Sequence, residues 1–326
     1  MLNNIKKVVF LYNLKRGTEP YEADFDEQCT IDAIIESISS QFICIPIEAT
    51  KDMLWIEKIS QEKPDIVFNV TEWFAWWARE AWIPTILDQL WITYTWPRPK
   101  EIVISHDKYL TKKILENDVV TPKSLLIKHT SLNQWYWKLG ENLSFPLICK
   151  LNSEWSSMWM NANCIVYNVE ELQNQISYLQ KNFLSDIIVE EYIDWRDISI
   201  SFIDWVWISE SIEYVYPNKT IYDYELKTSK NSSVTVKIAN NIGPALQKKI
   251  EQISQKIVEK MWVKWYCRID YRLDSNEEVY FLEVNAQVSF HPDGAFYWWA
   301  KTRNLSFNDL ILHVIYHSQR ELFTNS

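Results

Sequence analysis

The sequence predicts a protein of mixed α/β and α+β class, in which a small parallel α/β domain precedes two α+β units. Short apolar runs alternate with helical patterns through the N-terminal third, and this alternation is typical of a parallel sheet with crossover helices. A proline-rich break follows at residues 96–99, which indicates a boundary. The rest has the pattern of a small α+β unit followed by a strand-rich unit. We therefore expect three parts, residues 1–98, 99–185 and 186–326.

The N-terminal domain is expected to contain four strands and three helices. The strands are apolar runs bounded by polar residues, and the helices repeat apolar residues about every three to four positions. The expected strands are Lys7–Tyr12, Phe42–Ile47, Asp65–Val70 and Ile92–Tyr94, and the expected helices are Glu27–Ser40, Lys51–Gln61 and Ala78–Leu90.

Helix caps and strand-like runs organise the two later parts. Ser105 is expected to cap a helix that has Asp107 in its first turn and ends near Asn117. Gly243-Pro244 and Ser306 open two further helices. The other expected elements are strands at Ser124–Lys128, Phe145–Lys150, Asn163–Tyr167, Asp186–Tyr192, Ile198–Ile203, Val206–Ile212, 264–273 and 278–285, and a helix at Val169–Lys181.

Composition and charge restrict the classes of function. The 326-residue chain carries a net charge of -10, which disfavours a nucleic-acid partner. Its apolar runs are all shorter than the roughly 18 residues that cross a membrane, and the first ends at Lys15-Arg16, too early for a secretory signal. The five cysteines are scattered without a C-x-x-C pair, as in reducing compartments. We therefore expect a cytoplasmic protein without a membrane partner.

Glycine and tryptophan occur in abnormal numbers. There are 4 glycines and 18 tryptophans, whereas average usage would give about 23 glycines in this length. Trp205 lies in an expected hairpin turn, and Trp91 and Trp262 follow expected helices, which are positions that favour glycine. We infer that many of these codons are UGA, which some bacterial lineages reassign, and that the source organism reads them as glycine. The alternative is a tryptophan-rich protein such as a carbohydrate binder with stacking platforms.

Two strand segments near the C-terminus carry the most informative side chains. Residues two apart on a strand share a face, so Arg268 projects with Asp270, and Glu283 projects with Asn285. If the strands are neighbours, two carboxylates, an amide oxygen and a guanidinium meet at one place. Such oxygens suit Mg²⁺, and arginine can stabilise negative charge on a phosphoryl or acyl group. The alternative is a hairpin with a solvated polar face.

Two earlier segments also have the composition of a ligand site. The strand Phe145–Lys150 ends in a lysine, and the loop after it contains serines and two tryptophans. If those tryptophans are glycine, the loop presents amide and hydroxyl groups that suit phosphate. The strand Asp186–Ile193 ends in acidic residues, with Asp197 four positions on. The alternatives are a flexible loop and solvated acidic groups.

Together and in this order, these motifs resemble those of the ATP-grasp superfamily and, within it, of the D-alanine:D-alanine ligases. The resemblance implies an ATP-grasp fold preceded by a small parallel α/β domain, with 99–185 as the lid subdomain and 186–326 as the subdomain that holds the metal site. The motifs are H-D-K at 106–108, E-(G)-S-S-M-(G)-M at 154–160, V-E-E-Y-I-D-(G)-R-D at 189–197, Y-D-Y-E-L-K at 222–227, (G)-Y-C-R-I-D at 265–270 and L-E-V-N at 282–285, where (G) stands for a tryptophan.

The resemblance also implies an activity and its residues. The family phosphorylates a carboxylate to an acyl phosphate, which an amine attacks to make an amide. The implied cofactors are ATP and Mg²⁺, or Mn²⁺ in its place, and the implied substrates are small amino acids. The implied residues are Arg268 and Ser156 for catalysis, Asp270, Glu283 and Asn285 for the metal, and Lys108, Lys150, Ser157, Glu190, Glu191, Ile193, Asp197 and Lys227 for the nucleotide.

This chain departs from the family at positions that contact the amino-acid substrates. A His-Gly motif is replaced by Asn69-Val-Thr-Glu72, a tyrosine is replaced by Thr228, and Pro-Gly-Met-Thr is replaced by residues 287–295. The early Glu-x-Glu-Val-Ser signature is not evident. The first expectation is a D-alanine:D-alanine ligase of cell-wall precursor synthesis. The alternatives are a ligase for other amino acids or peptides and an inactive nucleotide-binding protein, and a homodimer is left open.

Overall fold

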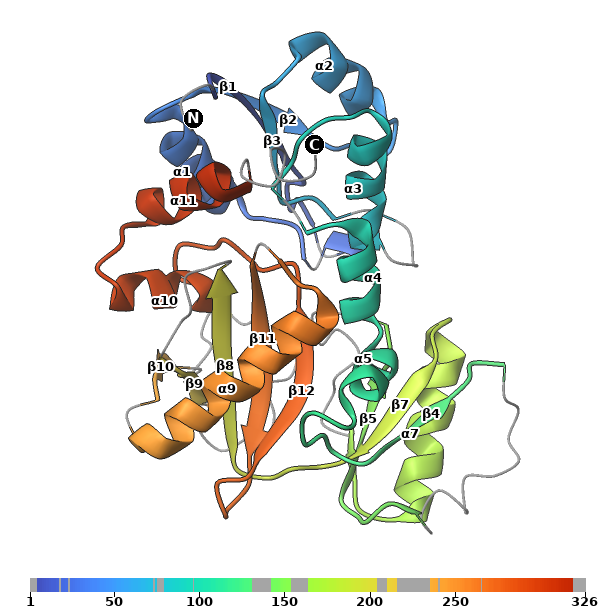
Figure 1. The fold of residues 1–326 in the computed structure, drawn as a ribbon. Helices are drawn as coiled ribbons and strands as arrows, with labels where there is room; N and C mark the ends of the chain where they lie inside the picture. The colour runs from blue at the N-terminus through green and yellow to red at the C-terminus, as the bar shows by residue number, and fades with distance from the viewer. Residues whose placement is uncertain are drawn as a thin grey trace.

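The fold consists of three β-sheets with helices packed around them (Figure 1). The computed structural model describes residues 5–17, 19–22, 24–72, 74, 79–95, 97–130, 142–153, 164–203, 210–215, 235–239, 241–264 and 266–318. No helix within these ranges is both long enough and apolar enough to cross a membrane.

The N-terminal sheet is parallel, as the alternating pattern predicts. Its strand order is β2-β1-β3, and apolar residues of β1 such as Phe10 are fully buried. The sheet consists of β1 (Lys7–Tyr12), β2 (Ile43–Glu48) and β3 (Ile66–Asn69), with helices α1 (Gln28–Ser39), α2 (Leu54–Glu62) and α3 (Arg79–Gln89) and the short 3-10 helix η1 (Pro20–Glu22).

The expected fourth strand, Ile92–Tyr94, is wrong. Only an isolated parallel bridge joins Val67 to Tyr94, with Val67 donating to the Thr93 carbonyl and accepting from the Thr95 amide. The contact ends there because Pro97, two residues on, has no amide hydrogen to extend the pairing.

The expected helix capped by Ser105 is also wrong, because two short helices occupy this stretch. α4 (Pro99–His106) begins with proline at its first position, and α5 (Lys108–Leu115) follows at once. Ser105 lies inside α4, and Asp107 caps α5 by accepting from the Leu110 amide at 2.8 Å. Pro99, which belongs to the proline-rich break in the sequence, starts α4, where its fixed φ is favourable.

The middle of the chain forms a small antiparallel sheet. Its order is β4-β7-β5-β6, and α7 buries Leu172, Ile176 and Leu179 against it. The elements are β4 (Ser124–Ile127), β5 (Leu147–Leu151), β6 (Ile165–Val166), α7 (Val169–Asn182) and β7 (Ile187–Glu191).

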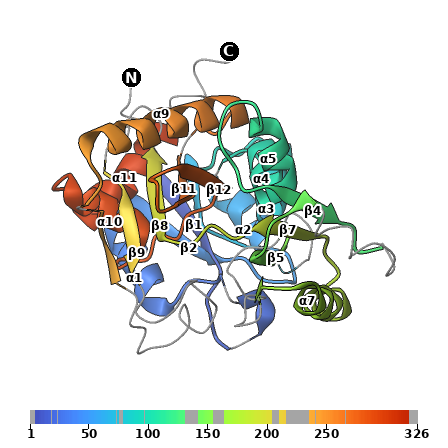
Figure 2. The same ribbon diagram turned by 90° about the horizontal axis from the view of Figure 1, so that it is seen from below.

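A larger antiparallel sheet follows, with the order β10-β9-β8-β11-β12. Helix α9 crosses one face of it, as Figures 1 and 2 both show. The last helix, α11, returns to pack on α1 of the N-terminal unit. The elements are β8 (Arg196–Ile203), β9 (Ile212–Val215), β10 (Thr235–Ile238), α9 (Pro244–Met261), β11 (Tyr266–Leu273), β12 (Val279–Asn285), α10 (Ala295–Thr302) and α11 (Phe307–Ser318).

Three of the described tryptophans have positive φ. Trp91, Trp195 and Trp262 have φ of 55°, 152° and 53°, and all three are exposed. At Trp91 the hydrogen bonds from Trp91 to Asp88 and from Ile92 to Leu87 form a Schellman motif, in which glycine is the usual residue. Four other non-glycine residues also have positive φ. Trp205 lies outside the described residues.

Trp91→Gly is expected to raise the free energy of unfolding by about 1 kcal/mol, because glycine adopts the left-handed backbone conformation at this position without strain. The Trp91 side chain is 95% exposed, so its removal costs little packing. Urea denaturation measures the change. Trp55→Gly is the matched control, since Trp55 lies in helix α2 and is fully buried; its loss is expected to cost about 3 kcal/mol or more. A destabilising Trp91→Gly would contradict the interpretation that glycine belongs at position 91.

Candidate active site

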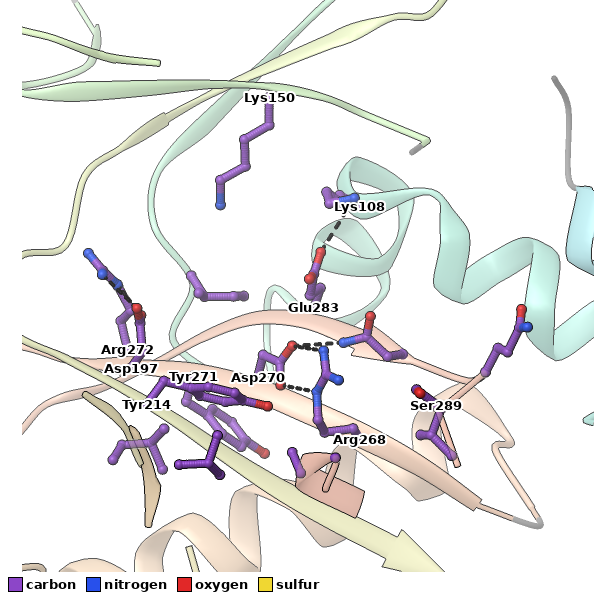
Figure 3. A pocket seen from close by; sticks show the side chains of 18 of the residues that line it. Lys108, Lys150, Asp197, Tyr214, Arg268, Asp270, Tyr271, Arg272, Glu283 and Ser289 are labelled. Carbon is purple, nitrogen blue, oxygen red and sulfur yellow. Dashed lines mark hydrogen bonds and ion pairs between the residues drawn. The ribbon is translucent and has the colours of Figure 1, made fainter. Parts of the chain in front are cut away.

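A cavity of about 420 Å³ lies between the two antiparallel sheets and reaches the N-terminal unit. Lys150 of the small sheet faces Glu283 and Asp270 of the large sheet across it (Figure 3). Glu72 of the N-terminal unit and Ser289, which follows β12, line it as well. Residues from distant parts of the sequence therefore meet in one hollow.

The pairing of β11 with β12 gathers the residues expected to form the metal and catalytic centre. Arg268 lies opposite Asn285, and Asp270 lies opposite Glu283. Arg268 donates two hydrogen bonds of 2.8 Å to the two oxygens of Asp270, and Asn285 Nδ2 donates another of 2.8 Å to Asp270 Oδ2. The sequence prediction that these four side chains share one place is confirmed.

A β-bulge at Leu282 makes this arrangement possible. Before it, Phe281 faces the core under α9, and after it Val284 does so. A regular strand would turn residues 281, 283 and 285 to the same face. The extra residue instead turns Glu283 toward the cavity, on the same face as Asp270.

Lys108 is held over Glu283 by the start of α5. Its Nζ lies 3.4 Å from Glu283 Oε2. The side chain of Asn152 fixes this helix start, since it accepts from the Tyr109 amide at 2.9 Å and donates to Asp107 at 2.8 Å. Burial alone would raise the pKa of Glu283, but Lys108, Lys150 and Arg268 hold it below its usual value, so the carboxylate is kept charged.

Glu190 lies between Lys112, which is buried, and Lys150, which is partly buried. Its oxygens are 2.9 Å from Lys112 Nζ and 2.9 Å from Lys150 Nζ. Lys112 also donates to the carbonyls of Phe281 and Leu282 at 3.3 and 3.0 Å. It therefore links the bulge in the large sheet to Glu190 of the small sheet. Lys112 was not among the site residues expected from the sequence. It lies four residues after Lys108, on the same face of α5, and this spacing could have indicated that the two lysines act at one site.

Arg272 also lines the cavity and was not among the site residues expected from the sequence. It pairs with both carboxylate oxygens of Asp197, which the resemblance assigns to the ribose. Its signal was the alternation of Arg268, Asp270 and Arg272 on one face of β11. Ile193 and Glu191 line the cavity as expected, while Ser156, Ser157 and Lys227 lie outside the described residues.

Positions that depart from the family pattern also line the cavity. Gln287, Ser289 and Asp293 belong to the segment after β12, and Glu72 belongs to the segment after β3. His291 does not line the cavity, and its Nδ1 accepts from the Asp293 amide at 3.0 Å, as expected for a loop histidine with a local partner.

The comparisons with known proteins agree with this architecture. The family model described as D-ala D-ala ligase C-terminus matches residues 119–316. The D-alanine–D-alanine ligase of Aquifex aeolicus is 28% identical over 263 residues, which cover 79% of this chain and 84% of that protein. The corresponding enzyme of Fervidobacterium nodosum is 28% identical over 291 residues, or 84% and 89% of the two chains.

Solved structures are similar over nearly the whole chain. The D-alanine–D-alanine ligase of Bacillus anthracis complexed with ATP has a TM-score of 0.76 at 20% identity, covering 98% of both chains. The VanG D-Ala:D-Ser ligase of Enterococcus faecalis has a TM-score of 0.74 at 19% identity, covering 96% of this chain and 99% of that chain. At these identities the likeness concerns the fold.

Glu190→Gln is expected to lower the free energy of unfolding at pH 7 by about 3 kcal/mol, because it leaves the ammonium groups of buried Lys112 and partly buried Lys150 without their carboxylate partner. Burial would raise the pKa of Glu190, but Lys112 and Lys150 hold it at about 2. The ionised group therefore stabilises the fold above the unfolded-state pKa near 4.5, and this contribution is lost as the pH falls toward 2. Urea denaturation at pH 7 and pH 3 measures the free energy of unfolding of both proteins. The difference between wild type and Glu190→Gln is expected to be smaller at pH 3 than at pH 7. An equal difference at both pH values would contradict the account.

Proposed function

Because the chain belongs to the D-Ala–D-Ala ligase family and is an ATP-grasp ligase that forms a carbon–nitrogen bond, we propose that it joins two D-alanine molecules. The product would serve cell-wall precursor synthesis. The observation that carries the proposal is the group formed by Arg268, Asp270, Glu283 and Asn285, which faces two lysines across one cavity. That combination suits phosphoryl transfer to a carboxylate.

The metal ligands in this proposal are Asp270, Glu283 and Asn285. Two carboxylates and one amide oxygen form a hard donor set, which Mg²⁺ or Mn²⁺ accepts together with substrate phosphates. Asn285 donates to Asp270 through Nδ2, so its Oδ1 is the atom that would serve as a ligand. When bound, the metal supplies positive charge beside the transferring phosphoryl group.

The nucleotide would lie along the cavity between the two sheets. Lys108 and Lys150 supply cations for its phosphates, and Ser157 and Lys227 are proposed to join them. Asp197 is proposed for the ribose, and the backbone near Ile193 for the base. Glu190 acts in this proposal through Lys150 and Lys112, since its two oxygens are paired with them. Glu191 accepts from the Ser144 amide at 2.9 Å and is proposed to position the rim of the base site.

The proposed reaction has two steps. A carboxylate oxygen of the first D-alanine attacks the γ-phosphorus of ATP, and the bond from that phosphorus to the β-γ bridging oxygen breaks to release ADP. The amine of the second D-alanine then attacks the acyl phosphate, loses a proton and expels inorganic phosphate. Arg268 stabilises the negative charge on the reacting carboxyl and phosphoryl oxygens, and Ser156 is proposed to assist it.

A second candidate is a ligase that accepts a different second amino acid. The observation that favours it is the cavity lining, because Glu72, Gln287 and Asp293 lie at positions where this chain departs from the family pattern. The nucleotide and metal residues are the same for both candidates, so only the acceptor distinguishes them.

D-alanine is expected to stimulate release of phosphate from ATP in the presence of Mg²⁺, because the acyl phosphate forms only when a carboxylate is bound. The assay compares D-alanine with L-alanine, D-serine and a panel of other amino acids, using a synthetic gene that encodes glycine at the turn-context tryptophan positions. Weak phosphate release with D-alanine alone that increases when a second amino acid such as D-serine is added would favour the second candidate.

Arg268→Met tests the catalytic role of Arg268 in the same assay, and turnover by the wild type separates a ligase from an inactive nucleotide-binding protein. It is expected to lower kcat by about 100-fold or more while weakening ATP binding far less, because the arginine acts on the transition state. Glu283→Gln is expected to abolish turnover. Near-normal kcat in Arg268→Met would remove its catalytic assignment, and ATP binding without turnover across the whole panel would contradict the ligase proposal.

A further inference from the structure

Arg272 has an extensive set of contacts at the end of the cavity formed by Asp197 and Ile193. Its guanidinium pairs with both oxygens of Asp197, one of them at 2.9 Å, and Nη1 donates to the Ile193 carbonyl at 2.6 Å. The same group lies over the Tyr192 ring, 4.8 Å from its centroid. In Figure 3 the pair of Arg272 and Asp197 lies on the opposite side of Asp270 from Ser289.

These contacts brace the chain segment that joins the two antiparallel sheets. Residues 192–195 connect β7 of the small sheet to β8 of the large sheet. On the small-sheet side, the Tyr192 amide donates to the Pro146 carbonyl at 2.9 Å. On the large-sheet side, Arg272 of β11 holds Tyr192, Ile193 and Asp197 together. The joining segment is therefore fixed from both sheets where it lines the cavity.

The charge of this pair is also suited to the site. Arg272 is 5% exposed, and an arginine side chain keeps its positive charge in proteins. A planar guanidinium that donates to two oxygens fixes the carboxylate in one orientation, which a lysine cannot do. A carboxylate oxygen can accept more than one hydrogen bond, so an oriented Asp197 carboxylate suits the hydroxyl groups of a sugar.

We propose that Arg272 is a positioning residue that sets affinity and sugar specificity for the nucleotide, by orienting the Asp197 carboxylate and the Ile193 backbone. It takes no part in phosphoryl transfer. The inference rests on the proposed placement of ATP in this cavity, and not on the identity of the amino-acid substrates.

The test compares Arg272→Met with Arg196→Met. Arg196 is a matched control because it also lies on the large sheet and pairs with a carboxylate, Glu213, at 2.6 and 3.1 Å, yet it is not among the described residues that line the cavity. Isothermal titration with Mg²⁺ and a non-hydrolysable ATP analogue measures the dissociation constants, and the titration is repeated with the 2′-deoxy form of the analogue.

Arg272→Met is expected to weaken binding of the analogue by about tenfold or more, as for loss of hydrogen bonds between charged groups. It is also expected to reduce the preference for ribose over 2′-deoxyribose. In turnover, KM for ATP should rise, while kcat and KM for the amino acid stay within about twofold. Arg272→Lys should be intermediate, and Arg196→Met should bind the analogue as wild type does.

Unchanged binding in Arg272→Met, an unchanged ribose preference, or an equal loss in Arg196→Met would each overturn the inference. If Arg272→Met does not fold, Arg272→Lys carries the same comparison, because it removes the two-point pairing and leaves Asp197 unchanged. A wild-type chain that binds the analogue but shows no amino-acid-dependent turnover would contradict the proposed function alone, since the titration still tests Arg272.

Discussion

The proposed active centre depends on the β-bulge at Leu282 in the pairing of β11 with β12. Without the extra residue, the alternation that buries Val279 and Phe281 under α9 would bury Glu283 as well. With it, Glu283 faces Asp270, and two carboxylates from separate strands reach the same space. Lys112 donates to the carbonyls of Phe281 and Leu282 and so holds the bulge in place. The geometry of the site is thus set by the backbone before any ligand binds.

Paired charges then join the parts of the molecule around that centre. Glu190 of the small sheet binds Lys112 of α5 and Lys150 of its neighbouring strand, and Lys108 reaches Glu283 of the large sheet. Arg272 braces the segment between the two sheets. Lys108 and Lys150, the two described lysines that are proposed to meet phosphates, each have a carboxylate beside them. The site therefore keeps its charges oriented, which is the condition for electrostatic catalysis without reorganisation.

The sequence was sufficient to predict most of the strands and the grouping of four polar side chains on β11 and β12, but not β10. Period-two alternation on Arg268 and Asp270 shows which side chains share a face, and a hairpin-like spacing brings Asn285 alongside. Helix starts were harder to predict, because a proline is common both at a domain boundary and in the first turn of a helix, as Pro99 is in α4. Lys112 and Arg272 were missed because their roles arise from contacts with strands 75 to 170 residues away along the chain. The positive φ of Trp91 and Trp262 could be foreseen, since turn chemistry is local.

The central claim is that the chain activates a carboxylate by phosphorylation, and oxygen transfer tests it most directly. D-alanine labelled with ¹⁸O in its carboxylate is supplied with ATP and Mg²⁺, and the released phosphate is analysed by mass spectrometry. The account requires one labelled oxygen in each phosphate, because the attacking carboxylate oxygen stays with phosphorus when the amine displaces it. Unlabelled phosphate would show that water attacks ATP instead, and would contradict an acyl phosphate at this site.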